Sequence, residues 1–263
     1  MAIGISRALL VVGLGAARIV PVTAGVSPFG GAHVPAPARV GFGLLLACLV
    51  EPALAAAAAR AGLEHAGSGL ILLVLARELL VGFGVGLVVS FAFRAAEAAG
   101  RLVDALRGAS LAEVLVPTTD ERGSPMGALY ALLATLVFLE LGGVARLLDA
   151  LLTSYAAVPL AGAVAPETLR AAASVVVVAS ARLIEVALAL AAPVVVALWL
   201  TDLALGMIAR VAPQVPVYFV GLPAKGLLAV GVVLLGLGAL EHALVVDLPG
   251  WMQLARRWLG AWA

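Results

Sequence analysis

The sequence predicts an all-α membrane protein, and three observations lead to this fold class. Of the 263 residues, 64% are hydrophobic and 12% are charged, whereas soluble domains average about 45–50% and 25%. Leucine, alanine and valine fill long apolar regions that few turn-forming clusters separate. Charged residues stand inside several of these regions. A soluble globule of this length needs a more polar surface, so the excess apolar surface must face lipid or other subunits.

Charge and cysteine content argue against a nucleic-acid-binding protein and against a fold held by internal disulfides. The net charge of +1 offers no electrostatic attraction to nucleic acid. Cys48 is the single cysteine, so no disulfide can form within the chain. Met1–Val26 does not read as a cleaved signal peptide, because Arg18 and Pro21 interrupt its apolar run.

Six apolar regions predict helices, several of them broken or hairpin-like, within one integral membrane domain over residues 1–263. Valine-rich stretches such as Val175–Val178 would suit parallel strands, but no alternation of strands and helices accompanies them. Pro193 should kink or break the fifth region, which as one helix would be roughly 50 Å long. The regions are Ala8–Val26, Val40–Ala59, Gly69–Phe93, Met126–Tyr155, Ala171–Leu205 and Val217–Leu240.

Charged residues inside the apolar regions point to protected surroundings. Such residues usually face a bundle interior, a water-filled path or a partner. The alternative is a simple bundle whose charges reach the lipid headgroups. The orientation stays open, because six spans would put the arginines of Arg94–Arg122 and Arg256–Arg257 on opposite sides of the membrane. The charged residues are Arg18, Glu51, Arg77, Glu78, Glu140, Arg182, Glu185 and Asp202.

A stripe of alternating charge follows the third apolar region. Spacings of three and four residues place its members on one face of a helix. The other face is small, with Ala95, Ala96, Ala98, Ala99 and Gly100, and small residues let helices approach closely. The stripe is either an ion-paired face packed in an assembly or a solvated face. Its members are Arg94, Glu97, Arg101, Asp104 and Arg107.

A loop is predicted within residues 112–126. Pro117 and Pro125 prevent it from continuing either flanking helix, and Gly123 gives it freedom to bend. A polar loop in lipid would leave backbone groups unsatisfied, so it must lie in water or line a cavity. The central residues are Val116, Pro117, Thr118, Thr119, Asp120, Glu121, Arg122 and Gly123.

No catalytic, cofactor-binding or metal-binding residues are predicted. The glycines of Val11–Arg18 and Val81–Gly86 have neither the spacing nor the βαβ setting of a dinucleotide site. Gly82 and Gly86 instead predict a close helix–helix contact. None of His33, His65 and His242 has a second ligand four residues away.

Several motifs in the right order resemble the FliR/SctT family of export proteins. The strongest is Ala212-Pro-Gln214 followed by an apolar run and Gly221-x-Pro223-x-Lys225. Arg77-Glu-Leu-Leu-Val-Gly82 and the pieces Gly100–Asp104, Arg107–Ser110 and Ser124–Gly127 also match. The pieces Arg107–Ser110 and Ser124–Gly127 look like the injectisome branch (SctT, YscT, EscT, SpaR, HrcT) rather than flagellar FliR. Val215-Pro216 and Val116 depart from the family pattern, in which an asparagine-containing run and an aspartate are usual.

The resemblance implies an inner-membrane subunit of a type III export gate for unfolded proteins. It implies SctR/FliP-type and SctS/FliQ-type partners, further SctU/FlhB-type and SctV/FlhA-type components, and a loop that plugs the closed pore. It implies no cofactor and no enzymatic activity. The alternatives are a flagellar export protein and a secondary transporter with broken helices at Pro193 and Gly82–Gly86, although no inverted repeat is evident. A third alternative is an intramembrane enzyme, but the sequence lacks the nucleophile or the set of metal ligands that such an enzyme needs.

Overall fold

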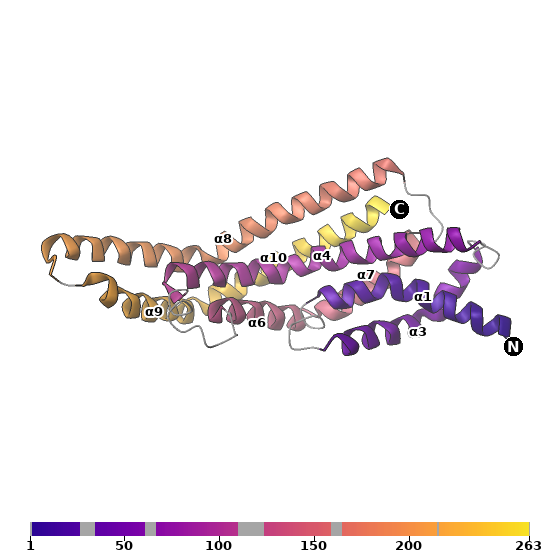
Figure 1. Cartoon of the computed structure of the whole chain (residues 1–263), viewed down its shortest axis with the longest axis horizontal. Helices are drawn as coiled ribbons and strands as arrows, with labels where there is room; N and C mark the ends of the chain where they lie inside the picture. Colours follow the sequence, from indigo (N-terminus) through magenta and orange to yellow (C-terminus); the bar gives the residue numbers. More distant parts are fainter. Residues whose placement is uncertain are drawn as a thin grey trace. The chain divides into compact units, whose positions relative to one another are not determined.

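The computed structural model describes residues 2–26, 35–60, 67–109, 124–158, 165–214 and 216–262. Within these ranges the chain is helical apart from short turns and bends, and no strand occurs. The predicted all-α fold class is therefore confirmed (Figure 1). The helices are α1 (Ala2–Gly25), α3 (Ala36–Arg60), α4 (Ser68–Leu106), α6 (Pro125–Glu140), α7 (Gly143–Ala157), α8 (Pro166–Val211), α9 (Val217–Leu235) and α10 (Leu237–Trp262).

Three of these helices, α4, α8 and α9, are long and apolar enough to cross a membrane. The interrupted pair α6 and α7 makes a fourth candidate span, and shorter apolar helices cover Leu10–Gly25 and Ala36–Leu49. In a bilayer, a helix satisfies its own backbone hydrogen bonds, which explains why apolar chain of this length adopts helices alone. The protein is thus an α-helical membrane protein.

Prolines and glycines set several of the helix ends. Pro125 and Pro166 begin α6 and α8, the first-turn position at which proline costs no hydrogen bond. Gly142, at φ 66°, lies between α6 and α7, and this left-handed conformation is open to glycine without steric cost. The predicted region Met126–Tyr155 is therefore two helices.

Four members of the charged stripe, Arg94, Glu97, Arg101 and Asp104, lie on the last part of α4, which has 39 residues, and Arg107 lies in the turn that follows. The structure differs from the sequence prediction at two other places. The apolar region predicted to end at Leu240 is interrupted at Gly236, and α10 continues to Trp262. The rest of α10 escaped prediction because its apolar residues form one face of an amphipathic helix rather than a continuous run. Pro193 does not end α8, which continues through it.

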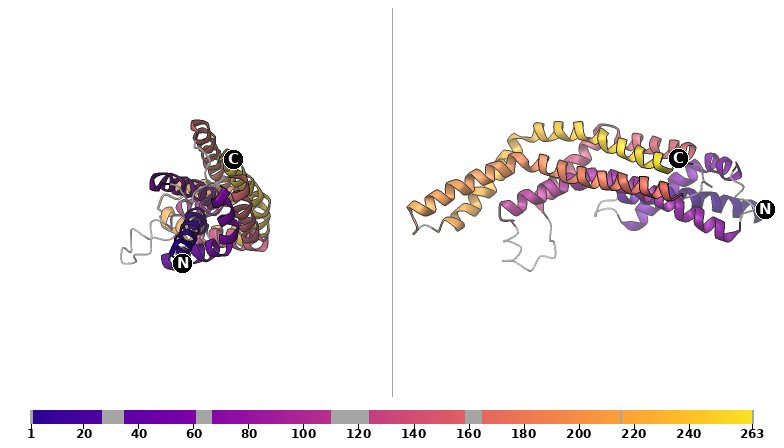
Figure 2. Two further views of the ribbon diagram at one scale, coloured as in Figure 1. Left: turned by 90° about the vertical axis from the view of Figure 1, so that its right-hand side faces the viewer. Right: turned by 90° about the horizontal axis from the view of Figure 1, so that it is seen from above.

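The described residues group into two compact units, and α4, α8 and α10 each contribute to both. The first unit lies within residues 1–92, 138–181 and 248–263, and the second within 93–137 and 182–247. The core of the first unit joins Val11 and Leu14 of α1 to Leu54 of α3 and Val74 of α4. Helices α1 and α3 run side by side in this unit (Figures 1 and 2). Within a membrane, such contacts stabilise the fold mainly through van der Waals packing.

The second unit contains a helical hairpin. The C-terminal part of α8 turns back through a short link, and α9 runs alongside it (Figures 1 and 2). Gly221 of α9 packs closely on α8, because a Cβ added there would lie 2.7 Å from Leu205 Cδ1. The hairpin exposes much of its apolar surface, including Leu203, Met207, Phe219 and Leu227.

Candidate functional site

A buried ion pair between Arg18 and Glu78 lies in the interior of the first unit. Both side chains are 0% exposed. Arg18 Nε donates to Glu78 Oε2 at 2.5 Å, and Arg18 Nη2 donates to Oε1 at 2.9 Å. This two-point contact matches the planar guanidinium to the carboxylate. It ties α1 to α4 across 60 residues of sequence.

Further hydrogen bonds of Arg18 go to α7 and to Val158, which caps the C-terminal end of α7. Nη1 donates to Ser154 Oγ at 3.0 Å, and Nη2 also donates to the carbonyl of Val158 at 3.3 Å. The Tyr155 ring lies 4.2 Å from the guanidinium carbon, within the range of a cation–π contact. We call Arg18, Glu78, Ser154, Tyr155 and Val158 the Arg18 cluster. It confirms the prediction that charges face a bundle interior, and at these positions the snorkelling alternative is wrong.

Two glycines of α4 bring this helix against the backbone of α1. A Cβ at Gly82 would lie 2.0 Å from the carbonyl oxygen of Arg18, and one at Gly86 would lie 2.8 Å from that of Pro21. Real Cβ atoms do not come this close to a backbone oxygen, so α1 would have to move. The predicted small-residue contact at Gly82 and Gly86 is thus confirmed, and it places Arg18 within reach of Glu78.

The end of α10 packs on α4 beside the Arg18 cluster. Trp258 Nε1 donates to the carbonyl of Val81 at 3.0 Å, and its ring fills the space where a Cβ of Gly84 would stand, 1.9 Å away. Arg77, which is 4% exposed, donates to the carbonyl of Trp262 at 3.2 Å. This contact was not foreseen. Tryptophans spaced by seven and four residues, at Trp251, Trp258 and Trp262, lie on one face of a helix and could have indicated a buried face.

In the second unit, Asp104 joins the end of α4 to the start of α6. Its Oδ2 accepts hydrogen bonds from the Ser124 hydroxyl at 2.5 Å and from the Met126 N–H at 3.0 Å. Its Oδ1 accepts one from Arg107 Nε at 2.6 Å. Ser124 in turn accepts from the Gly127 N–H at 2.9 Å, as a residue capping a helix N-terminus does.

We call this arrangement the Asp104 clamp. Gly100 contributes to it, since a Cβ there would lie 2.2 Å from the carbonyl oxygen of Met126. The clamp joins the two ends of the segment that contains the predicted loop. The loop itself, Val116–Gly123, lies outside the residues that the structure describes.

The other members of the charged stripe have different surroundings. Asp104 is 6% exposed, and the Arg107 side chain is 17% exposed. By contrast, Arg94 is exposed and the Arg101 side chain is 66% exposed, paired with Glu97 within the same helix. Ala95, Ala96 and Ala99 on the small face are fully buried. One end of the stripe therefore packs within this chain, and the other is open to lipid, water or a partner.

The family motif covers the turn after α8 and the first half of α9. Pro213 and Gln214 are exposed, and Pro223 is exposed within α9. Gly221 packs on α8 as described above, and the ammonium of Lys225 pairs with Asp202 of α8. The motif thus includes two contacts that hold the hairpin together.

Three of the predicted interior charges are exposed on this chain. Glu140, Glu185 and Asp202 all lie at the surface. Asp202 is half exposed and pairs with Lys225, whereas the described residues do not bury Glu140 and Glu185. The described ranges contain no group of three His, Cys, Asp or Glu side chains placed to hold a metal ion. The Arg18 cluster and the Asp104 clamp suit structural support, because in each the hydrogen bonds join groups of this chain to one another.

Comparisons with known proteins identify relatives. The family model described as "Bacterial export proteins, family 1" matches residues 9–247. The chain is 31% identical to the Yop proteins translocation protein T of Yersinia pestis over 159 residues, which is 60% of each protein. It is 31% identical over 197 residues to the flagellar biosynthetic protein FliR of Bacillus subtilis, covering 75% of this chain and 74% of that one.

A third relative is the secretion system apparatus protein SsaT of Salmonella typhimurium. It is 30% identical over 172 residues, 64% of each protein. The matches to the Yersinia and Salmonella proteins thus span less than two thirds of their lengths.

Proposed function

The chain belongs to family 1 of the bacterial export proteins, and from this premise we propose that it is a membrane subunit of a type III protein export gate. With SctR/FliP-type and SctS/FliQ-type subunits it forms the channel for unfolded protein substrates in the bacterial inner membrane. SctU/FlhB-type and SctV/FlhA-type components act beside it. The names of its relatives, which include a translocation protein, a secretion apparatus protein and a flagellar biosynthetic protein, support this role.

The observation that carries the proposal is the mixed surface of the hairpin formed by α8 and α9. Apolar side chains such as Leu203 and Phe219 are exposed beside the half-exposed carboxylate of Asp202. Lipid suits the apolar residues but not a charged group. Neighbouring subunits satisfy both, because their helices supply apolar contact and polar partners together.

The role is structural, without catalysis or a cofactor. Within the Arg18 cluster, and likewise within the Asp104 clamp, the polar side chains bond to other groups of the same cluster, as Arg18 does to Glu78. Energy for export comes from another component. Injectisome and flagellar relatives both match, and the Ser124–Gly127 motif favours the injectisome branch.

Co-purification tests the proposal directly. The tagged chain, extracted from its native membrane in mild detergent, should bring SctR- and SctS-type subunits with it. Co-expression with these subunits should raise its steady-state level and protease resistance, because a partner that binds only the folded chain stabilises it. A monomer with the same level and resistance with and without those subunits would contradict the role.

We further propose that residues Val116–Gly123 plug the resting pore. Support comes from the Asp104 clamp, which holds both ends of this segment together whatever the segment itself does. A plug has to be released on export, so it is held by no more than a few kcal/mol.

Deleting Val116–Gly123 tests the plug while leaving the clamp residues in place. The complex should assemble normally, and cells that carry it should take up a normally excluded solute. The control is Asp104→Asn, which weakens the clamp and keeps the loop. Normal impermeability of a fully assembled deletion complex would show that the segment is only a connector.

A further inference from the structure

Two ion pairs connect α8 to the helices that run back along it in the second unit. Arg182 is the first residue of α8 in the second unit, and its Nη2 donates to Oδ1 of Asp247 in α10 at 2.5 Å. Further along α8, Asp202 pairs with Lys225 of α9. The first pair holds α8 against α10 and the second holds α8 against α9, and Pro193 of α8 lies between them.

Both helices depart from a regular α-helix between these two pairs, although the N–H of Gly236 still donates to the Val232 carbonyl at 2.9 Å. Pro193 has no N–H and cannot donate to the carbonyl of Ala189, so α8 lacks one hydrogen bond there. On the opposite helix, Gly236 separates α9 from α10. Pro193 lies 11 residues after Arg182, and Gly236 lies 11 residues before Asp247. The two interruptions are therefore at matching levels of the antiparallel pair.

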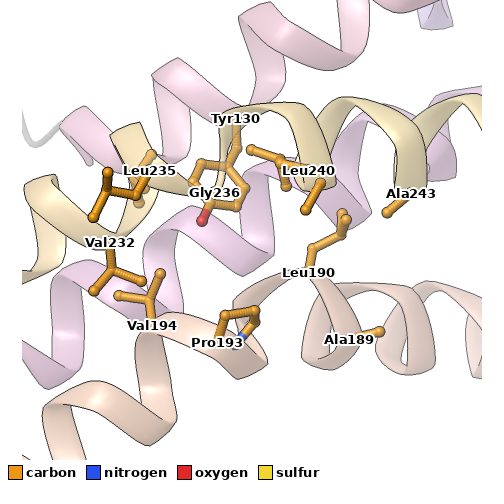
Figure 3. A pocket seen from close by; sticks show the side chains of 12 residues that line it. Tyr130, Ala189, Leu190, Pro193, Val194, Val232, Leu235, Gly236, Leu240 and Ala243 are labelled. Carbon is orange, nitrogen blue, oxygen red and sulfur yellow. The ribbon is translucent and has the colours of Figure 1, made fainter.

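A partly open pocket of about 460 Å³ lies between the two interruptions. Pro193 and Gly236 are on different helices that face one another across it, and Tyr130 of α6 reaches in from a third side (Figure 3). The rest of its lining is aliphatic, including Leu190, Val194 and Leu240. The pocket is partly open to the surroundings of the chain, so the helices do not pack on one another throughout this level and have room to move.

We propose that the second unit has a hinge beside this pocket, at Pro193 of α8 and at Gly236 between α9 and α10. The outer arm consists of residues 194–211 and 217–235, and the inner arm of residues 182–192 and 237–247. The outer arm moves as one body, because the Asp202–Lys225 pair and the Gly221–Leu205 contact hold its two helices together. The inner arm is held likewise by Arg182 and Asp247. Bending occurs at Pro193 and Gly236, where helices bend most readily.

The geometry sets the size of the expected motion. Val211 lies 18 residues beyond Pro193 in α8, which is about 27 Å along a helix. A swing of about 10° at the hinge would therefore move Val211 by roughly 5 Å. A motion of this size broadens a spin-label distance distribution measurably.

The test uses the full chain in lipid nanodiscs with the background change Cys48→Ser. Nitroxide labels at Val211 and at Leu132, an exposed residue of α6, report on movement across the hinge. Labels at Leu203 and Leu227, both exposed on the outer arm, form the internal control. Double electron–electron resonance should give a broad distribution for the first pair and a narrow one for the second.

Paired variants assign the breadth to the hinge. Pro193→Ala restores a backbone donor to α8 and should narrow the first distribution by half or more. Pro223→Ala makes the same change in α9 away from the pocket and should leave it unchanged. Gly236→Ala should also narrow it, whereas Gly231→Ala, where a Cβ meets nothing within 4 Å, should not.

The proposal would be overturned if the two label pairs gave distance distributions of equal width. It would also be overturned if Pro223→Ala narrowed the Val211–Leu132 distribution as much as Pro193→Ala, or if Gly231→Ala narrowed it as much as Gly236→Ala. A narrow Leu203–Leu227 distribution in every variant verifies that the arm is folded. The hinge rests on the fold alone and not on the export role. A rigid arm in a chain that still co-purifies with export subunits would therefore refute the hinge and leave the proposed function standing.

Discussion

The Arg18 cluster makes the change Glu78→Gln the most informative perturbation of this protein. Glutamine keeps the shape of glutamate but removes its charge, so the guanidinium of Arg18 stays buried without a counterion. Arg18 and Glu78 are both 0% exposed, so neither water nor a headgroup is available to replace the lost partner. The Ser154 hydroxyl and the Val158 carbonyl remain as neutral acceptors.

The expected loss of stability is about 3–5 kcal/mol, the usual result of breaking a fully buried ion pair by removing one partner. This corresponds to roughly two to three and a half powers of ten in the equilibrium between folded and unfolded chain. The double variant Arg18→Met with Glu78→Leu removes both charges of the pair and keeps an apolar fill, but Arg77, which is 4% exposed, loses the carboxylate that lies 3.9 Å from its Nη1. It should therefore recover part of the lost stability, because well-packed apolar replacements of buried pairs are often neutral.

Unfolding of the full chain in mixed micelles by increasing SDS, followed by tryptophan fluorescence, measures these differences. Glu185→Gln provides the matched control, since Glu185 is exposed and its change should cost less than about 1 kcal/mol. The reasoning is refuted if Glu78→Gln costs no more than Glu185→Gln, or if the double variant is as unstable as Glu78→Gln.

Three further variants probe the other contacts. Gly82→Ala should separate α1 from α4 and lower protease resistance, because its Cβ would lie 2.0 Å from a backbone oxygen, whereas Gly13→Ala has open space and should behave as wild type in the same digestion. Trp258→Ala should cost about 3–5 kcal/mol in SDS unfolding by leaving a void at α4, and an unchanged midpoint would mean that α10 does not pack there. Asp104→Ala should cost more than Arg101→Ala, about 1–3 against under 1 kcal/mol, since only Asp104 bonds to α6.

Helices and interior charges could be predicted because they depend on local composition. A long run of leucine, alanine and valine in lipid has no stable alternative to a helix. A charge in such a run needs a partner, which is why Arg18 and Glu78 could be recognised as interior residues. That they pair with one another could not, because 60 residues separate them and nothing local relates α1 to α4.

Other features could not be predicted because packing decides them. Asp104 reads as one member of a charged stripe, and its role at the start of α6 depends on the close approach that Gly100 permits. The final part of α10 is polar enough to pass for a tail, yet the ring of Trp258 is buried at Gly84. In both cases a glycine on one helix matches a side chain on another, and a single sequence does not show such pairs.

The order in which the residues of the Arg18 cluster are synthesised has a consequence for biogenesis. Arg18 leaves the ribosome first, Glu78 follows 60 residues later and Ser154 136 residues later. At about 5–20 residues per second, the arginine waits roughly 3–12 s for its carboxylate and about 7–27 s for the hydroxyl. During that interval α1 carries an unpaired charge that lipid does not accommodate. The nascent N-terminal helix must therefore be retained by the insertion machinery, or remain at the membrane surface, until α4 arrives.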